Sequence, residues 1–293
     1  ASLGAVAVVA ALLSGAPASA RPLALPVGPL VPAASGTVAA AVGSVDRFSR
    51  DAVIEAYRSW FAPTLTVATG WTGNVGSCTA GAISAENVAA TLSAVNYVRA
   101  QAGLPAVLWN DEMARRAQAA ALIMAANGWL NHHPPSTAAC WTAEGYDGAS
   151  HGNLSVFSTG PRAVASYMID GGGNLTVGHR RWLLYQQLWA IGSGDVAQNN
   201  SIYVLGPRLV TGTVQWVPWP TDGYFPAELE PYGRWSLSYP GADFSTATVA
   251  VTAPDGKVII APPVVQDGAG DPTIAWDMVL PRTDAFGHLR AGP

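Results

Sequence analysis

The chain has 293 residues, of which 49% are apolar and only 12% are charged. This composition is typical of a folded protein with a large buried core and argues against a disordered chain. The formal net charge of −4 and the lack of any run of Lys or Arg argue against nucleic-acid binding. The length is sufficient for one large domain or two ordinary ones.

The first twenty residues have the pattern of a signal peptide. The segment LGAVAVVAALLSGAPASA, residues 3–20, joins a short apolar run to small residues that end in Ala18-Ser19-Ala20. This ending is an A-x-A-type cleavage site, which predicts a mature chain that begins at Arg21. A membrane anchor is the alternative, but the apolar run is much shorter than the roughly 20 residues that a spanning helix needs. No later segment qualifies, so we expect a secreted protein without a transmembrane segment.

Secretion gives the two cysteines a role. Cys78 and Cys140 are the only cysteines of the chain, and an oxidising compartment joins such a pair. The bridge would close a loop of about 60 residues and contribute roughly 4 kcal/mol in the chain-entropy account. Neither cysteine lies in a recognisable nucleophile motif, which disfavours a catalytic cysteine.

The chain then divides into a linker and a helical region. Residues 21–45 are rich in Pro, Ala and Gly, lack periodicity and are typical of a linker. Order is expected to begin near Asp46, with a rough helical stripe after it. Two helices with clear ends follow, one from about Ser84 to Ala102 and one that begins after the cap residue Asn110 and stops at Gly128.

The motif VGHRRWLL, residues 177–184, contains the first candidate functional residue, His179. As a strand, this motif would place charge on both faces. As a helix beginning near Gly178, it places His179 on one face with Trp182 and Leu183, while the two arginines turn outward. A first-turn position and burial both favour a neutral imidazole, which can accept a hydrogen bond or ligate a metal.

A longer set of motifs resembles a known family. AVNYVRAQAGLPAVLWNDEMARRAQAAALIMAANGWLNHHPP, followed by VGHRRWLL and WAIGSGD, resembles the bacterial branch of the CAP superfamily of cysteine-rich secretory, antigen 5 and pathogenesis-related proteins. The likeness covers residues 46–207. It implies an α+β fold, a CAP-type α/β/α sandwich of helices around a small, mostly antiparallel sheet, with residues 188–195 and 200–206 as strands. It also implies a central cavity lined by two histidines and two acidic residues, which hold a divalent metal in some members.

The resemblance assigns the cavity positions one by one. His132 matches the first cavity histidine and His179 the second. Asp170 falls where relatives carry an acidic residue ahead of the Gly-His pair, although beside three glycines it could equally cap a turn. The second acidic position holds Gly152, so either His151 beside it substitutes in part or the site lacks that ligand altogether.

These residues predict a weak metal site. We expect His179 to face inward and approach His132 across a cleft, with Asp170 orienting a ring or completing a third ligand. Because Gly152 replaces the second acidic residue, Zn²⁺ or another divalent cation is expected to bind weakly. His133 is interpreted as a solvated loop residue.

Residues 213–293 have the pattern of a small all-β domain. VQWVPWPTDGYFP is interpreted as a crossing segment, and Glu228 and Glu230 beyond it are expected at the surface. Four short alternating stretches follow, RWSLSY, TATVAVT, KVII and TIAWDMV. We interpret them as an Ig-like sandwich that is incomplete, because such a domain has about seven strands and the closing PRTDAFGHLRAGP loses the alternation.

Two classes of function are compatible with these features. The first is a secreted, non-enzymatic module whose CAP cavity or groove binds a lipid-like apolar ligand or a cell-envelope ligand, with the β-sandwich as an accessory. The second is a metal-assisted hydrolase that uses His132, His179 and Asp170 around an activated water. The sequence has no G-x-S-x-G elbow, H-E-x-x-H helix or P-loop, and no convincing general base. We therefore favour the first class.

Overall fold

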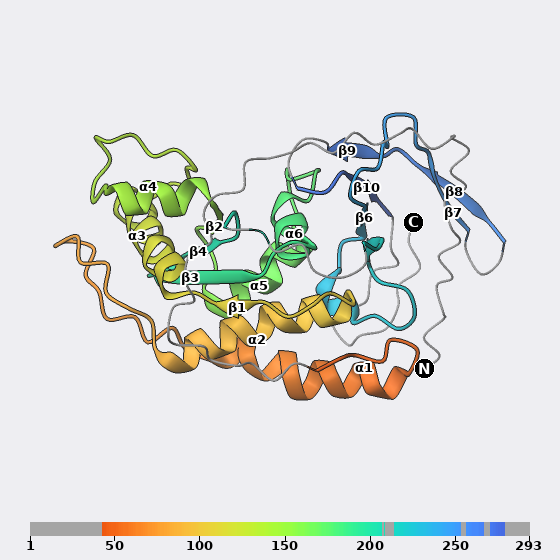
Figure 1. The fold of residues 1–293 in the computed structure, drawn as a ribbon, viewed down its shortest axis with the longest axis horizontal. Coiled ribbons are helices and arrows are strands. Elements are labelled where there is room, and N and C mark those ends of the chain that lie inside the picture. The colour runs from red at the N-terminus through yellow and green to blue at the C-terminus, as the bar shows by residue number, and fades with distance from the viewer. Residues whose placement is uncertain (1–42, 207, 209–213, 253–255, 267–269, 279–293) are drawn as a thin grey trace.

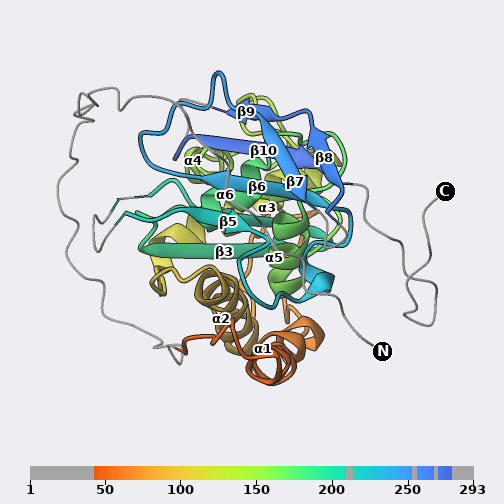
Figure 2. The same ribbon diagram turned by 90° about the vertical axis from the view of Figure 1, so that its right-hand side faces the viewer.

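The computed structural model describes residues 43–206, 208, 214–252, 256–266 and 270–278. The predicted signal peptide, most of the predicted linker and the closing stretch 281–293 lie outside the described residues. Figure 1 shows α1 and α2 along one side of the molecule, α3 and α4 at one end, and the C-terminal strands at the other. Figure 2, turned by 90°, also places the C-terminal strands β9 and β10 away from α1 and α2.

The N-terminal helices begin and end close to where their cap residues predict. The elements are α1 (Arg50–Ala56), η1 (Tyr57–Phe61), η2 (Ala62–Thr66), α2 (Ala85–Gln101) and α3 (Asp111–Asn127). Asn110 caps α3 by accepting a hydrogen bond from the backbone N–H of Met113, and Gly128 ends the helix in the left-handed conformation. Ser84 caps α2 in the same way through the N–H of Asn87. Both predicted helices are therefore confirmed.

A four-stranded sheet forms the centre of this region, in the order β1-β3-β4-β2. The strands are β1 (Leu108–Trp109), β3 (Ala190–Val196), β4 (Asn199–Tyr203) and β2 (Gly152–Ser155). Only β1 and β3 pair in parallel, and the other two pairings are antiparallel. The strands predicted at 188–195 and 200–206 are confirmed as β3 and β4.

Glycines on β3 let α3 lie directly against the sheet. A Cβ at Gly192 would be 2.1 Å from the backbone N of Ala114, and one at Gly194 would be 2.2 Å from the Cα of Gln118. Side chains alternate along a strand, so Asp195 points to the opposite face, where it accepts a hydrogen bond from the N–H of Gly160 at the start of α5 (Gly160–Ile169). Helices therefore cover both faces of the sheet, and α2 packs beside α5.

The C-terminal strands form two antiparallel sheets. One has the order β5-β6-β10-β9 and the other pairs β7 with β8. Their bounds are β5 (Val217–Trp219), β6 (Arg234–Ser238), β7 (Val249–Thr252), β8 (Val258–Ala261), β9 (Val264–Gln266) and β10 (Thr273–Asp277). The four predicted stretches are β6, β7, β8 and β10. The stretch expected to be a crossing segment contains β5, which pairs with β6.

The two C-terminal sheets share one small core, but part of this region also belongs to the main core. Trp235 of β6, Val249 of β7 and Ile274 of β10 pack in one cluster. Val217 and Trp219 of β5, however, are buried in the same cluster as the helices α2 and α5. Residues after the stretch 207–213, where the sequence suggested a change of domain, therefore pack in one core with residues before it.

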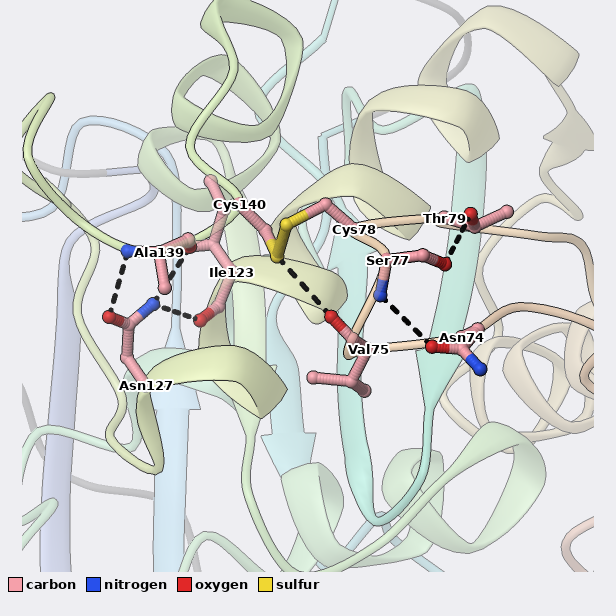
Figure 3. The surroundings of a disulfide bond; sticks show 9 residues. All are labelled: Asn74, Val75, Ser77, Cys78, Thr79, Ile123, Asn127, Ala139 and Cys140. Atoms are coloured by element: carbon pink, nitrogen blue, oxygen red, sulfur yellow. Dashed lines mark hydrogen bonds between the residues drawn. A yellow bond between two sulfur atoms is a disulfide. The ribbon is translucent and has the colours of Figure 1, made fainter.

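The disulfide between Cys78 and Cys140 is present, as predicted. It ties the loop before α2 to the segment that leads into α4 (Ala143–Ser150), and the carbonyl oxygen of Val75 lies beside the sulfur of Cys140 (Figure 3). Asn127, at the end of α3, donates to the carbonyl of Ala139 and accepts from its N–H, so the same segment is also held without the bridge.

Within the described residues, no helix combines the length and the apolar character that a membrane crossing requires.

Candidate functional site

The loop between α5 and α6 (Gly178–Leu183) begins and ends with a residue in the left-handed conformation. Asp170 follows α5 with a φ of 48°, and Val177 precedes α6 with the same φ. This conformation is rare for a β-branched residue, and such strain is found most often at functional sites. Val177 is fully buried, so the core holds it in place.

Asp170 and His179 form the centre of the candidate site. The Oδ1 atom of Asp170 lies 2.8 Å from the Nδ1 atom of His179 and also accepts a hydrogen bond of 2.7 Å from the Asn174 amide. The Oδ2 atom accepts from the backbone N–H of Arg180. The side chain of Asp170 is 2% exposed and that of His179 is 27% exposed. A buried carboxylate therefore fixes one nitrogen of a ring that reaches the surface.

The face of the His179 ring rests on Tyr167. The two ring centroids are 4.9 Å apart. The Tyr167 hydroxyl donates to the Oδ1 atom of Asn200, whose amide donates to Asp195. Burial raises the pKa values of Tyr167 and Asp195, the latter to about 6. The His179 ring thus packs against a side chain, Tyr167, that belongs to a buried polar network.

The C-terminal sheet also binds the loop between α5 and α6. The Nη1 atom of Arg234, on β6, donates to the carbonyl oxygens of Asp170, Gly172 and Asn174. Arg180 donates to the carbonyls of Met168 and Ile169 at the end of α5.

The prediction that the arginines of α6 turn outward is wrong for Arg180, which is 1% exposed and pairs with Glu230. Glu230 is 3% exposed, so its expected surface position is wrong as well. Burial raises the pKa of Glu230 and the positive charge of Arg180 opposes that change. Arg180 turns inward because this carboxylate and several carbonyl oxygens satisfy its donors there.

The other predicted histidines gather at the end of α4. The exposed His132 contacts the Ala149 carbonyl through Nδ1, at 2.9 Å. The Nδ1 atom of His151 lies 2.9 Å from the Asp147 carbonyl, and its ring stacks on Tyr203. His133 is exposed, beside the hydroxyl of Tyr146. In the described part of the chain, no group of three or more His, Cys, Asp or Glu side chains is arranged to hold a metal ion.

Part of this chain is similar to known proteins. The family model named CAP, "Cysteine-rich secretory protein family", matches residues 92–213, which include both Asp170 and His179. The chain contains a CAP domain. A solved structure, an extracellular protein containing a SCP domain from Bacillus anthracis str. Ames, is 16% identical, with a TM-score of 0.32. The similarity covers 41% of this chain and 40% of that one. No curated protein matches the chain.

The CAP domain of this chain has no room for an acidic residue at position 152. A Cβ on Gly152 would lie 2.6 Å from the Gly148 carbonyl and 2.7 Å from the Ser201 hydroxyl. The glycine is therefore required by the close approach of β2 to α4 and β4.

Sequence reasoning missed four residues that hold this site, namely Asn174, Tyr167, Glu230 and Arg234. Asn174 lies beside the glycine run, where the only local pattern is a glycosylation triplet. Arg234 and Glu230 come from beyond residue 213, and no local pattern links them to the loop.

Proposed function

We propose that this chain is a secreted CAP-domain protein that binds an apolar or cell-envelope ligand and does not catalyse a reaction on it. The observation that carries the proposal is the fixed ring of His179. Its Nδ1 atom contacts Asp170, its face rests on Tyr167, and its Nε2 atom has no hydrogen-bond partner among the described residues. A neutral ring held in this way offers one acceptor to a donor group of a ligand.

Exposed apolar side chains border the same loop. Leu175 is 48% exposed and Tyr232 is 72% exposed. The Tyr232 ring lies beside Gly171, where an added Cβ would be 3.7 Å from it. Apolar side chains next to one polar anchor suit a ligand with an apolar part and a polar group. This arrangement supports an amphipathic ligand, such as a lipid of the cell envelope.

The surroundings of His179 favour binding over catalysis. The hydrogen-bond partner of its Nδ1 atom is the carboxylate of Asp170, and no serine, threonine or cysteine of the described chain is hydrogen-bonded to its ring. A catalytic zinc site usually has three protein ligands, and the described residues do not bring three together. They therefore do not fit the metal centre that a hydrolase of this kind requires.

A metal-assisted hydrolase is the second candidate, and one observation favours it. A carboxylate bound to Nδ1 is the arrangement that commonly orients a metal-ligating histidine. His179 could thus bind a divalent cation through Nε2, together with His132 as the sequence predicts. With so few ligands the cation would bind weakly, so we place this function second.

Secretion and the role of the C-terminal region are parts of the same proposal. The disulfide supports an oxidising compartment. The two antiparallel sheets around Trp235 support an Ig-like accessory sandwich. Because Arg234 of β6 holds the loop of His179, this sandwich would also stabilise the binding site.

Extraction of ligand from the purified protein tests the proposal. Wild-type protein, His179→Ala and the control His133→Ala are purified in parallel, and their organic extracts are compared by mass spectrometry. We expect one class of amphipathic molecule with the wild type and with His133→Ala, and at least a tenfold smaller amount with His179→Ala. Equal amounts in all three, or none in any, would contradict the proposal. Ester hydrolysis that depends on His179 would favour the second candidate instead.

A further inference from the structure

The two cysteines of the disulfide differ in how far solvent can reach them. Cys78 is exposed, in the loop before α2. Cys140 is half-buried and packs against the apolar cluster that includes Leu122 and Met124. A thiolate exchanges with a disulfide by attacking a sulfur that it can reach. Attack from solvent is therefore directed at the Sγ atom of Cys78.

Both cysteines have an unfavourable backbone conformation. The φ angle is 53° at Cys78 and 56° at Cys140. This left-handed region disfavours residues that carry a Cβ atom, and among the described residues only five that are not glycine have a positive φ. The disulfide joins two of these five. Its cleavage removes a constraint on both backbones, and strained or exposed disulfides are the ones that exchange with thiols most easily.

The segments on either side of the bridge also have hydrogen bonds of their own. The backbones of Asn74 and Thr79 exchange two hydrogen bonds, of 2.8 and 2.9 Å, which close the loop around Cys78. On the other side, the side-chain amide of Asn127 is bonded to both backbone groups of Ala139 (Figure 3). These bonds do not involve the sulfurs, so cleavage of the bridge leaves both segments in place. Exchange can therefore take place in the folded protein.

We propose that Cys78 is a thiol-exchange site, at which a thiol from outside the protein forms a mixed disulfide. The attacking thiolate forms a new S–S bond with the Sγ atom of Cys78, and the bond to Cys140 breaks. The electron pair leaves with the Cys140 sulfur, which takes up a proton from water. The attacking sulfur is oxidised and the Cys140 sulfur is reduced, so the step needs no other oxidant.

The surroundings of Cys140 favour the mixed disulfide once it has formed. The carbonyl oxygen of Val75 lies 3.6 Å from the Cys140 sulfur, where it can accept a hydrogen bond from the released thiol. Only the thiolate form attacks a disulfide, so a thiol held in this way returns to Cys78 slowly. The adduct on Cys78 therefore persists long enough to be isolated.

Reaction of the native full chain with reduced glutathione tests this proposal. The reaction is stopped by alkylation, and the intact protein and its peptides are analysed by mass spectrometry. We expect one glutathione on Cys78, an alkylated Cys140 and an unchanged circular dichroism spectrum. The rate should lie within about tenfold of the rate measured in urea, because no unfolding is needed. Stronger protection in the native protein, or glutathione found mainly on Cys140, would overturn the proposal.

Two single variants test the difference between the sulfurs without the bridge. Cys140→Ser leaves a thiol at the exposed position, and its matched control Cys78→Ser leaves one at the half-buried position. With oxidised glutathione, Cys140→Ser should form a mixed disulfide at least about tenfold faster, because access limits the reaction. Equal rates, or a faster reaction of Cys78→Ser, would overturn the proposal. Peptide mapping of the wild type still decides the matter if either variant fails to fold.

A further arm identifies the source of the thiol. A dithiol oxidoreductase whose C-x-x-C motif retains only the attacking cysteine is mixed with the wild type and, as the control, with Cys78→Ser/Cys140→Ser. A covalent complex through Cys78 that forms only with the wild type supports the site and indicates a protein thiol as its partner. Reaction with glutathione but not with the oxidoreductase supports the site with a small thiol as its partner. A complex of equal yield with the double variant would overturn the proposal, because this variant has no cysteine.

Discussion

Arg180 and Glu230 form an ion pair in which each side chain is 1% exposed, and this pair joins α6 of the CAP domain to the segment before β6. Arg180 also donates to the Arg234 carbonyl on β6. Arg234 in turn binds the loop that holds Asp170 and His179. The geometry of the candidate site therefore depends on residues about 50 to 60 positions away in the sequence. Local sequence patterns would assign those residues to a separate accessory domain.

We predict that Glu230→Gln strongly destabilises the protein. Loss of one partner leaves the charge of Arg180 buried without its counter-ion, which typically costs about 3–5 kcal/mol. Urea unfolding of Glu230→Gln measures this cost. The matched control is Glu228→Gln, because Glu228 is exposed two residues away. A difference of less than about 1 kcal/mol between the two variants, within the usual range for surface changes, would show that the pair does not hold the two regions together.

Local sequence signals predicted the elements, and long-range contacts decided how the site is held. The caps Asn110 and Gly128 act within one helical turn, so the bounds of α3 could be predicted. The orientation of Arg180 could not be predicted in this way. α6 has only six residues, which is too short for a hydrophobic face to fix its rotation, and its partner Glu230 lies fifty residues away.

The disulfide is predicted to stabilise the chain by constraining its unfolded state. Cys78 and Cys140 are 62 positions apart, so the chain-entropy account gives about 4 kcal/mol. We expect Cys78→Ser/Cys140→Ser to lower the free energy of unfolding by about 2 to 4 kcal/mol, the range seen for native bridges. Reductant should destabilise the wild type by a similar amount and leave the double variant unchanged. Two titratable thiols in native, unreduced wild-type protein would contradict the predicted bond.

Position 152 is predicted to tolerate no side chain larger than hydrogen. Gly152→Ala would bring a methyl group within 2.6 Å of the Gly148 carbonyl, so β2 must move. Such overpacking costs about 1–3 kcal/mol. Gly173→Ala is the control, because an added Cβ there meets nothing within 4 Å. Thermal unfolding of both variants measures the difference, and equal melting temperatures would show that β2 adjusts freely.

The buried carboxyl of Asp195 predicts that stability falls as pH rises from about 4 to about 6. Burial raises its pKa in the folded protein from 3.8 to about 6. Between these values the folded state binds more protons than the unfolded state, so the free energy of unfolding decreases with increasing pH and levels off above 6. The change is expected to be of the order of 1–3 kcal/mol, at about 1.4 kcal/mol per pKa unit.

Urea unfolding across this pH range tests the contribution of Asp195. Asp195→Asn should reduce the pH-dependent decrease in the free energy of unfolding. Asp51→Asn, at an exposed position in α1, should leave this decrease unchanged. Part of the slope will remain in Asp195→Asn, because burial also raises the pKa of Asp271 to about 6. Identical pH profiles for the wild type and Asp195→Asn would contradict this prediction.

The roles of the candidate histidines could be predicted only in part, because they depend on which atoms the ring nitrogens meet. The contact between Asp170 and His179 joins two positions nine residues apart, and the resemblance placed both in one cavity. The contact of His132 with the Ala149 carbonyl involves a backbone atom at the end of α4. A sequence pattern does not specify such a contact, because any residue can provide the carbonyl.

The last prediction concerns metal binding at His179. Its Nδ1 atom is bound to Asp170, so a cation can reach the ring only through Nε2. Gly152 leaves the second acidic position empty, and the described residues form no three-ligand group. We therefore expect Zn²⁺ to bind weakly, with a dissociation constant well above that of structural zinc sites, whose binding free energies are about 10–16 kcal/mol. In isothermal titration calorimetry, His179→Ala should abolish this binding while His133→Ala retains it. The His179 ring is partly exposed and packs on one face only, so the free energy of unfolding of His179→Ala should change by less than about 1.5 kcal/mol. Zinc binding that survives in His179→Ala, or that is lost equally in His133→Ala, would place the cation elsewhere on the protein.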